Sequence, residues 1–235
     1  MTNPINFYGF CGIPLAASSH PHMSDSRPLF PLVLRLDGRA CLVVGGGPVA
    51  ARKAAALVEC GAVVTVVAPE TCAAVEALDV TIARRRYAPG EAASGRFRLV
   101  VTATGDPEVD RSVFLDAEGA GVLVNAADDP GSSSFHVPAV ARRGAVTVAV
   151  STEGTSPFLA GWVRSRVAEV LDEPVGDLAR IVGDVRSAVR ARGRSSEGLD
   201  WRGLVEERVW PRLSEGDEAG AEAGAAGWLA EVLSS

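Results

Sequence analysis

The sequence lacks any long apolar run. Although 47% of its 235 residues are hydrophobic, no stretch approaches the roughly 20 consecutive apolar residues that a transmembrane helix needs. The first residues also carry no positive segment before the apolar stretch 7–17, so a secretory signal is not expected. These absences predict a chain with no membrane partner that works in the cytoplasm.

Cysteine motifs and basic charge are also missing. The four cysteines show neither C-x-x-C spacing nor histidines at zinc-like intervals, so we predict no zinc module. Cys41 and Cys60 lie in apolar segments, where we expect buried free thiols. The net charge is −6, and residues 214–235 contain acidic residues but no Lys or Arg. This balance argues against a nucleic-acid partner, and it predicts a solvated acidic tail over 214–235.

Short apolar runs alternate with helical patterns from residue 40 onward. The run 40–44 is bounded by glycines and is typical of a strand buried on both faces. Further strands are predicted over 63–67, 80–83, 99–103 and 122–125, with helices over 49–60, 74–78 and 109–117. Strands and helices that alternate at these intervals predict βαβ units, and therefore an α/β fold with a Rossmann-type parallel sheet.

The pattern changes after residue 130. The alternating run 145–151 predicts one more strand, after a turn at Arg143 and Gly144. Ser156 can cap a helix that has Pro157 in its first turn. Two helical faces then follow, and they predict a small helical region that ends near residue 213. Residues 1–27 show no period and are predicted to be an N-terminal extension.

A glycine-rich loop joins the first strand to the first helix. Gly45, Gly46, Gly47, Pro48 and Val49, followed by Ala50, fit the pattern G-x-G-x-x-A. In this pattern the first glycine allows a tight turn, the second lets a pyrophosphate approach the backbone, and the alanine lets helix and strand pack closely. The loop therefore predicts dinucleotide binding, with a merely structural turn as the alternative.

The end of the second strand bears on which dinucleotide is bound. A carboxylate near this position usually binds the ribose hydroxyls of NAD. Here the strand ends in Ala68, Pro69 and Glu70, and no Arg follows immediately to hold the extra phosphate of NADP. We therefore predict NAD as the cofactor, without excluding NADP. Thr104, which follows the strand 99–103, is placed with the cofactor-binding residues.

Several segments together resemble a known family. The segment FPLVLRLDGRACLVVGGGPVAARKAAALVECGAVVTVVAPE resembles the N-terminal module of sirohaem synthases and the stand-alone precorrin-2 dehydrogenases related to it. Further matches are TATGDPEVDR (102–111), VNAADDPGSSSFHVPAV (124–140) and VAVSTEGTSPFLA (148–160). Together they cover about residues 28–192 in the family's order.

The resemblance implies an architecture and an activity. It implies an NAD-binding Rossmann domain over 28–137, a dimerisation region over 138–168 and a helical domain over 169–213, assembled as a homodimer. It also implies that precorrin-2 is oxidised by NAD to sirohydrochlorin, and in some members that Fe²⁺ is then inserted as a substrate metal. The methyltransferase half of the bifunctional synthases is expected to be absent.

The resemblance also assigns site residues. The family's essential aspartate matches Asp128, in the motif that begins at Asn125, with Asp129 as the neighbouring alternative. A carboxylate there can accept a proton as hydride leaves the macrocycle, although the same residues also fit an ordinary turn. His136, where the family often has an apolar residue, is a candidate for metal binding together with Asp128.

Other candidates concern the tetrapyrrole itself. Thr152 and Thr155 lie in a segment that resembles the family's Ser-rich loop near the substrate, in which Glu153 replaces a common glycine. Precorrin-2 carries several carboxylates, so arginines such as Arg142 and Arg164 are candidates to bind it. A solvated basic face is the alternative for each of them.

Two other functions remain open from the sequence. The first is a different small NAD-dependent dehydrogenase, which predicts a conventional catalytic Tyr-Lys pair or histidine. The one lysine, Lys53, lies on the helix after the glycine loop, and Tyr8 and Tyr87 have no such partner. The second is a non-enzymatic module that senses NAD or carries a tetrapyrrole, which predicts binding without NADH production.

Overall fold

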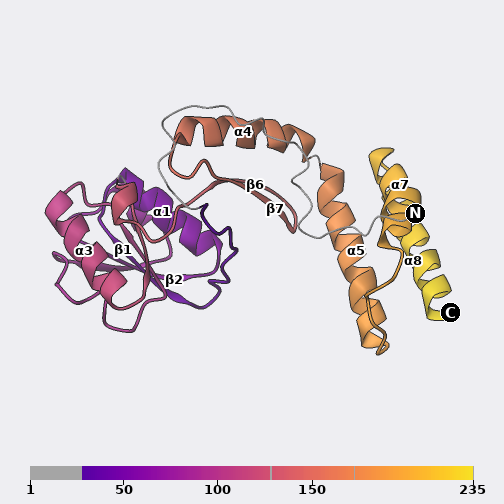
Figure 1. The fold of residues 1–235 in the computed structure, drawn as a ribbon, viewed down its shortest axis with the longest axis horizontal. Helices are drawn as coiled ribbons and strands as arrows, with labels where there is room; N and C mark the ends of the chain where they lie inside the picture. The colour runs from indigo at the N-terminus through magenta and orange to yellow at the C-terminus, as the bar shows by residue number, and fades with distance from the viewer. Residues whose placement is uncertain (1–27, 128, 172, 235) are drawn as a thin grey trace. The chain divides into compact units, whose positions relative to one another are not determined.

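A five-stranded parallel sheet forms the first part of the fold (Figure 1). The computed structural model describes residues 28–127, 129–171 and 173–234. The strands lie in the order β3-β2-β1-β4-β5. Their bounds are Ala40–Val44 (β1), Val63–Ala68 (β2), Thr81–Arg84 (β3), Leu99–Thr102 (β4) and Leu123–Ala126 (β5). The predicted Rossmann-type α/β fold is confirmed.

The helices of this part divide its core into two clusters. They are α1 (Pro48–Glu59), α2 (Ala73–Glu76) and α3 (Pro107–Gly119). Small residues of α1, such as Ala50 and Ala54, pack with one set of strand residues. Val113 and Ala117 of α3 pack with another. Strand residues therefore meet a helix on each face, which is why the central strands read as continuous apolar runs.

A two-stranded antiparallel hairpin follows the sheet. Its strands β6 (Ala139–Arg143) and β7 (Val146–Val150) are joined at Gly144, whose φ is +52°. A short 3₁₀ turn, η1 (Pro130–Ser132), precedes it, and helix α4 (Pro157–Val170) follows. The strand predicted over 145–151 is confirmed as β7, whereas β6 was not predicted because its sequence ends in two arginines.

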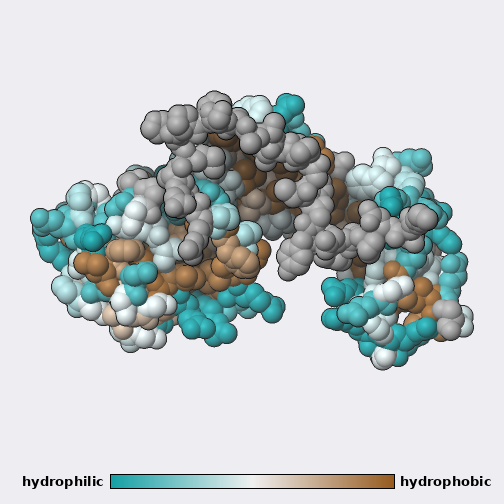
Figure 2. All heavy atoms as spheres, in the orientation of Figure 1, coloured by the Kyte–Doolittle hydropathy of each residue, from teal (hydrophilic) through white to brown (hydrophobic). Residues whose placement is uncertain are grey.

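The C-terminal helices form a third core. They are α5 (Glu173–Ala191), α6 (Trp201–Gly203), the π-helical segment η2 (Leu204–Val209), α7 (Trp210–Ser214) and α8 (Glu218–Ser234). The predicted solvated tail over 214–235 is wrong for α8, since Ala221, Ala225 and Trp228 are buried. Small residues let α8 pack closely, while its glutamates face outward. Figure 2 shows hydrophilic atoms on the outer sides of α5 and α8, with a hydrophobic strip between them.

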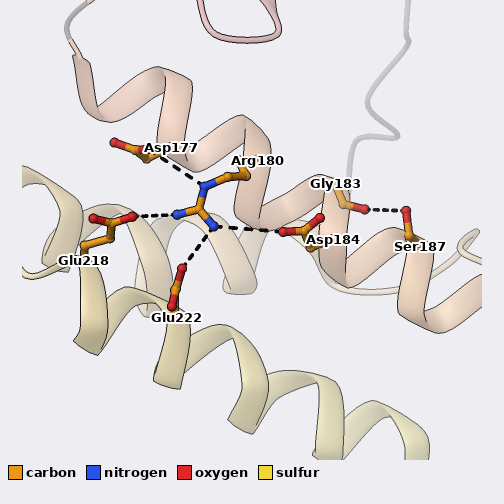
Figure 3. A network of polar contacts seen from close by, with 7 residues as sticks. All are labelled: Asp177, Arg180, Gly183, Asp184, Ser187, Glu218 and Glu222. Carbon is orange, nitrogen blue, oxygen red and sulfur yellow. Dashed lines mark hydrogen bonds and ion pairs between the residues drawn. The ribbon is translucent and has the colours of Figure 1, made fainter.

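Arg180 links these two helices (Figure 3). Its guanidinium lies 2.7 Å from Glu218 and 3.0 Å from Glu222 on α8. Asp177 and Asp184, on its own helix, each lie 4.0 Å away. Exposed ion pairs of this kind add little to the free energy of unfolding. We therefore attribute the stability of the C-terminal helices to their apolar core. The role that we attribute to Arg180 is to align α5 with α8.

The cysteines differ from one another in burial. Cys41 is fully buried in β1, and this burial raises the pKa of its thiol to about 11. The prediction that Cys60 is buried is wrong, because it follows the last turn of α1 and is exposed. In the described part of the chain, no helix is long and apolar enough to cross a membrane.

Candidate functional site

The glycine loop lies at the carboxyl ends of β1 and β2. Gly45 has a φ of +122°, and a Cβ there would lie 2.3 Å from the carbonyl oxygen of Ala103. A Cβ on Gly46 would lie 1.9 Å from the carbonyl oxygen of Glu70. A Cβ on Gly47, in contrast, would meet nothing within 4 Å. Neighbouring backbone thus requires the first two glycines, whereas Gly47 faces open space.

The open space beside Gly47 lies at the N-terminus of α1. Gly47 is the N-cap residue, Pro48 begins the helix, and no side chain caps its first turn. Ala50 is fully buried against the sheet. N–H groups at such a helix start can bind a pyrophosphate, and Val49 belongs to the same turn. The arrangement fits the diphosphate of a dinucleotide.

Glu70 lies directly beside the glycine loop. It follows Ala68, the last residue of β2, and Pro69, and its side chain is exposed. The neighbouring strand β3 ends at Arg84, in register with Ala68, and Arg84 lies 2.6 Å from Glu76 in an ion pair. An exposed carboxylate therefore follows β2 beside the glycine loop, while the nearby guanidinium already has a carboxylate partner.

Thr104 lies on the other side of the loop, after β4. Its amide nitrogen would lie 3.2 Å from a Cβ on Gly45. Its hydroxyl donates to Asp110 on α3 at 2.7 Å, and Asp110 also accepts from the hydroxyl of Thr102. Asp110 thereby fixes the turn that holds Thr104 at this edge of the sheet.

Asn125 joins α1 to the segment after β5. The side chain is 7% exposed. Its Oδ1 accepts from Nζ of Lys53 at 3.2 Å, and its Nδ2 donates to the carbonyl of Phe135 at 3.1 Å. Lys53, on the helix that follows the glycine loop, was not among the predicted site residues.

A cavity of about 370 Å³ opens beside this pair. Of the predicted site residues it gathers Asn125, His136 and Thr152. The other lining residues are Lys53, Ala126, Ala127, Ser133, Val137, Pro138, Ala139, Val150, Ser151, Gly154, Pro157 and Ala160. They come from the end of the parallel sheet, from the hairpin and from the start of α4. Its size and largely apolar lining are typical of a small-molecule site.

The two candidate aspartates are not equally placed. Asp128 lies outside the described residues. Asp129 is exposed, and its carboxylate accepts from the amide of Gly131 at 2.9 Å and from the hydroxyl of Ser132 at 2.6 Å. The hydrogen bond from Ser132 holds the pKa of Asp129 below its usual value. Asp129 is therefore occupied in capping η1.

The loop before α4 is held by its own hydroxyls. Thr152 Oγ1 donates to the carbonyl of Ser156 at 3.0 Å and accepts from its amide at 3.2 Å. Glu153 has a φ of +52°, in the left-handed region that favours glycine. Thr155 is exposed and is not among the lining residues.

The predicted arginines lie outside the cavity lining. Arg142 on β6 forms an ion pair of 3.3 Å with Glu59 at the end of α1. Arg164 is half-buried on α4. Among residues 28–127, 129–171 and 173–234, no group of three His, Cys, Asp or Glu side chains could hold a metal ion. His136 is therefore without further metal ligands in the part that the structure describes.

Comparisons with known proteins bear on this arrangement. Residues 32–139 match a family described as "Putative NAD(P)-binding". The chain is 39% identical over 200 residues to a sirohaem synthase of Chromobacterium violaceum, covering 83% of this chain and 42% of that protein. It is 40% identical over 189 residues to that of Thioalkalivibrio sulfidiphilus, covering 80% of this chain and 37% of the relative. The chain thus spans about two fifths of the length of these relatives.

A solved structure supports the fold. The structure titled "SirC, precorrin-2 dehydrogenase" superposes with a TM-score of 0.65 at 23% identity, covering 88% of this chain and all of the other. At this identity the likeness concerns the fold. The sequence matches confirm the resemblance that the motifs predicted.

Proposed function

We propose that this chain, which resembles sirohaem synthases over four fifths of its length, is an NAD-dependent dehydrogenase that oxidises precorrin-2 to sirohydrochlorin. The observation that carries the proposal is the position of the cavity, at the end of a dinucleotide-type sheet and beside the segment that bears Asp128. Ligands of open α/β sheets bind outside the carboxyl ends of the strands, and Asn125 and Ala126 at the end of β5 line the cavity.

The residues at the edge of the sheet fit the cofactor. Gly47 leaves room for the pyrophosphate, and Glu70 offers a carboxylate to the ribose. When bound, NAD supplies the acceptor for the hydride that leaves the macrocycle. Asn125 and Thr152 line the space in which the substrate is oxidised.

We assign Asp128 the role of general base. Oxidation of the macrocycle releases a hydride and a proton, and a carboxylate at the cavity can accept the proton. Two facts support this assignment: Ala127, its neighbour, lines the cavity, and the carboxylate of Asp129 is occupied in capping η1. Arg142, Arg164 and Thr155 remain candidates for contact with the substrate's outer carboxylates.

We further propose that the working protein is a cytoplasmic homodimer joined through residues 138–168. Helix α4 exposes 82% of Phe158, 46% of Leu159 and 56% of Trp162. Exposed apolar groups gathered on one helix are typical of an interface. A second copy is the partner that the resemblance implies.

Fe²⁺ insertion stays a prediction of the resemblance alone. The described part of the chain offers no set of three ligands, so the nitrogens of the macrocycle would have to supply most of the coordination. No observation raises this activity above the dehydrogenase.

The test is an anaerobic assay with enzymatically generated precorrin-2 and NAD, in which NADH and sirohydrochlorin are followed together. We expect equal amounts of both products. The variant Asp128→Asn should lose about 100-fold or more in kcat while its affinity for NAD is unchanged. Asp129→Asn, the matched control, keeps an oxygen for the amide of Gly131 and should retain most of the activity.

Three other outcomes would change the conclusion. Binding of NAD and tetrapyrrole without turnover would favour a sensor or carrier. NADH production from a different small substrate would favour another dehydrogenase. Equal losses in Asp128→Asn and Asp129→Asn would refute the role assigned to Asp128.

A further inference from the structure

His136 contains an atom that the fold leaves unsatisfied. The residue lies between η1 and β6 and lines the cavity, and its Nδ1 is buried without a hydrogen-bond partner among the described residues. Nearly all buried polar atoms in native proteins are hydrogen-bonded, so an exception requires an explanation. The family that the motifs resemble often has an apolar residue here, which would avoid this cost.

The burial of Nδ1 determines which nitrogen can meet a ligand. Because Nδ1 is buried and the residue lines the cavity, Nε2 is the ring nitrogen that can face the cavity. A proton on Nδ1 of the neutral ring would be a buried donor without an acceptor, which is rare. A proton on Nε2 leaves only a lone pair at Nδ1. The neutral ring thus presents an N–H donor to the cavity.

The surroundings and the ligand select the kind of acceptor. Lys53 lines the same cavity, with its Nζ 3.2 Å from Asn125 Oδ1. Most of the other described lining residues are apolar, so water competes poorly for the donor. Under the proposed function, the acceptors that the ligand brings to this donor are the carboxylates of the tetrapyrrole.

We propose that the Nε2–H of His136 donates a hydrogen bond to a carboxylate of the tetrapyrrole, beside Lys53, and that His136 determines substrate affinity. This inference rests on the proposed function. It differs from a metal-binding role, because a ligating histidine normally donates its second N–H to an acceptor. Nδ1 has no such acceptor among the described residues.

The test combines two measurements with opposite expected signs. His136→Leu removes both the unsatisfied nitrogen and the donor. We expect its melting temperature to rise by roughly 2–4 °C, and its dissociation constant for sirohydrochlorin to rise roughly tenfold. His136→Gln keeps a side-chain N–H donor and should recover part of the affinity. NAD affinity should be unchanged in both variants, because the glycine loop is intact.

Each contrary result is specific. Unchanged sirohydrochlorin binding by His136→Leu, with a wild type that turns over precorrin-2, would overturn this inference and leave the dehydrogenase intact. A lower melting temperature for His136→Leu would show a structural role instead. A loss confined to cobalt-loaded sirohydrochlorin would indicate ligation of the metal. A wild type that binds no sirohydrochlorin and produces no NADH would overturn both proposals.

Discussion

The parallel sheet and helix α4 both carry large apolar side chains, but they bury them to different extents. In β1, Leu42, Val43 and Val44 are at most 2% exposed. Within α4 only Ala160 is buried, while Phe158 is 82% exposed. The sheet completes its core within one chain, because helices cover both faces. Residues of helix α4 and the hairpin line the cavity, and α4 also exposes large apolar side chains. A ligand or a second copy of the chain can bury this apolar surface.

The largest expected effect concerns the glycine loop of the parallel sheet, the region whose core is completed within one chain. In Gly46→Ala the new Cβ would lie 1.9 Å from the carbonyl oxygen of Glu70, and backbone would have to move. We expect a loss of about 3 kcal/mol or more in the free energy of unfolding, measured by urea denaturation.

Gly47→Ala is the matched control, one residue along. Its Cβ would meet nothing within 4 Å, so the free energy of unfolding should change by less than about 0.5 kcal/mol. NAD affinity, measured by calorimetry, should nevertheless fall, because the methyl group occupies the approach of the pyrophosphate. Equal destabilisation by both variants would contradict the geometry of the loop.

The next effect concerns the exposed apolar side chains of helix α4. Trp162 is 56% exposed on α4, and Leu115 is 54% exposed on α3. We expect Trp162→Glu to weaken the homodimer by about 2 kcal/mol or more, as for a central aromatic at an interface. Leu115→Glu should leave it intact. Light scattering over a dilution series measures both, and dissociation by both variants, or by neither, would argue against an interface on α4.

The sequence predicted the sheet better than it predicted the site. The strands of the sheet are buried on both faces, so local apolar runs such as 40–44 suffice to find them. Strand β6 was missed because it ends in two exposed arginines. Helix α8 was misread because its buried alanines pack against residues of helices earlier in the chain. Lys53 reaches Asn125 across 72 positions. No local pattern encodes such a contact.

The smallest effect returns to the sheet region, where a half-buried phenol joins a loop to α3. Tyr87 donates to Asp116 at 2.7 Å and accepts from the amide of Ala92 at 3.0 Å. Tyr87→Phe leaves that amide without its acceptor, and we expect a loss of about 1–2 kcal/mol in the free energy of unfolding near pH 8.

The pH dependence gives the sharper measurement for Tyr87. Burial, followed by the hydrogen bond to Asp116, raises the pKa of the phenol above its usual value, which is about 10 in an unfolded chain. Above pH 10 the phenol of the unfolded state therefore loses a proton that the folded state keeps. This lowers the unfolding free energy of the wild type, whereas the Phe variant has no hydroxyl to titrate. The difference in unfolding free energy should be constant up to about pH 9 and shrink above pH 10. The pKa of Cys41 is also raised, but Cys41 is present in both proteins, so its effect on the unfolding free energy is the same in each. A difference in unfolding free energy that stays constant into alkaline pH would contradict the burial of the Tyr87 hydroxyl.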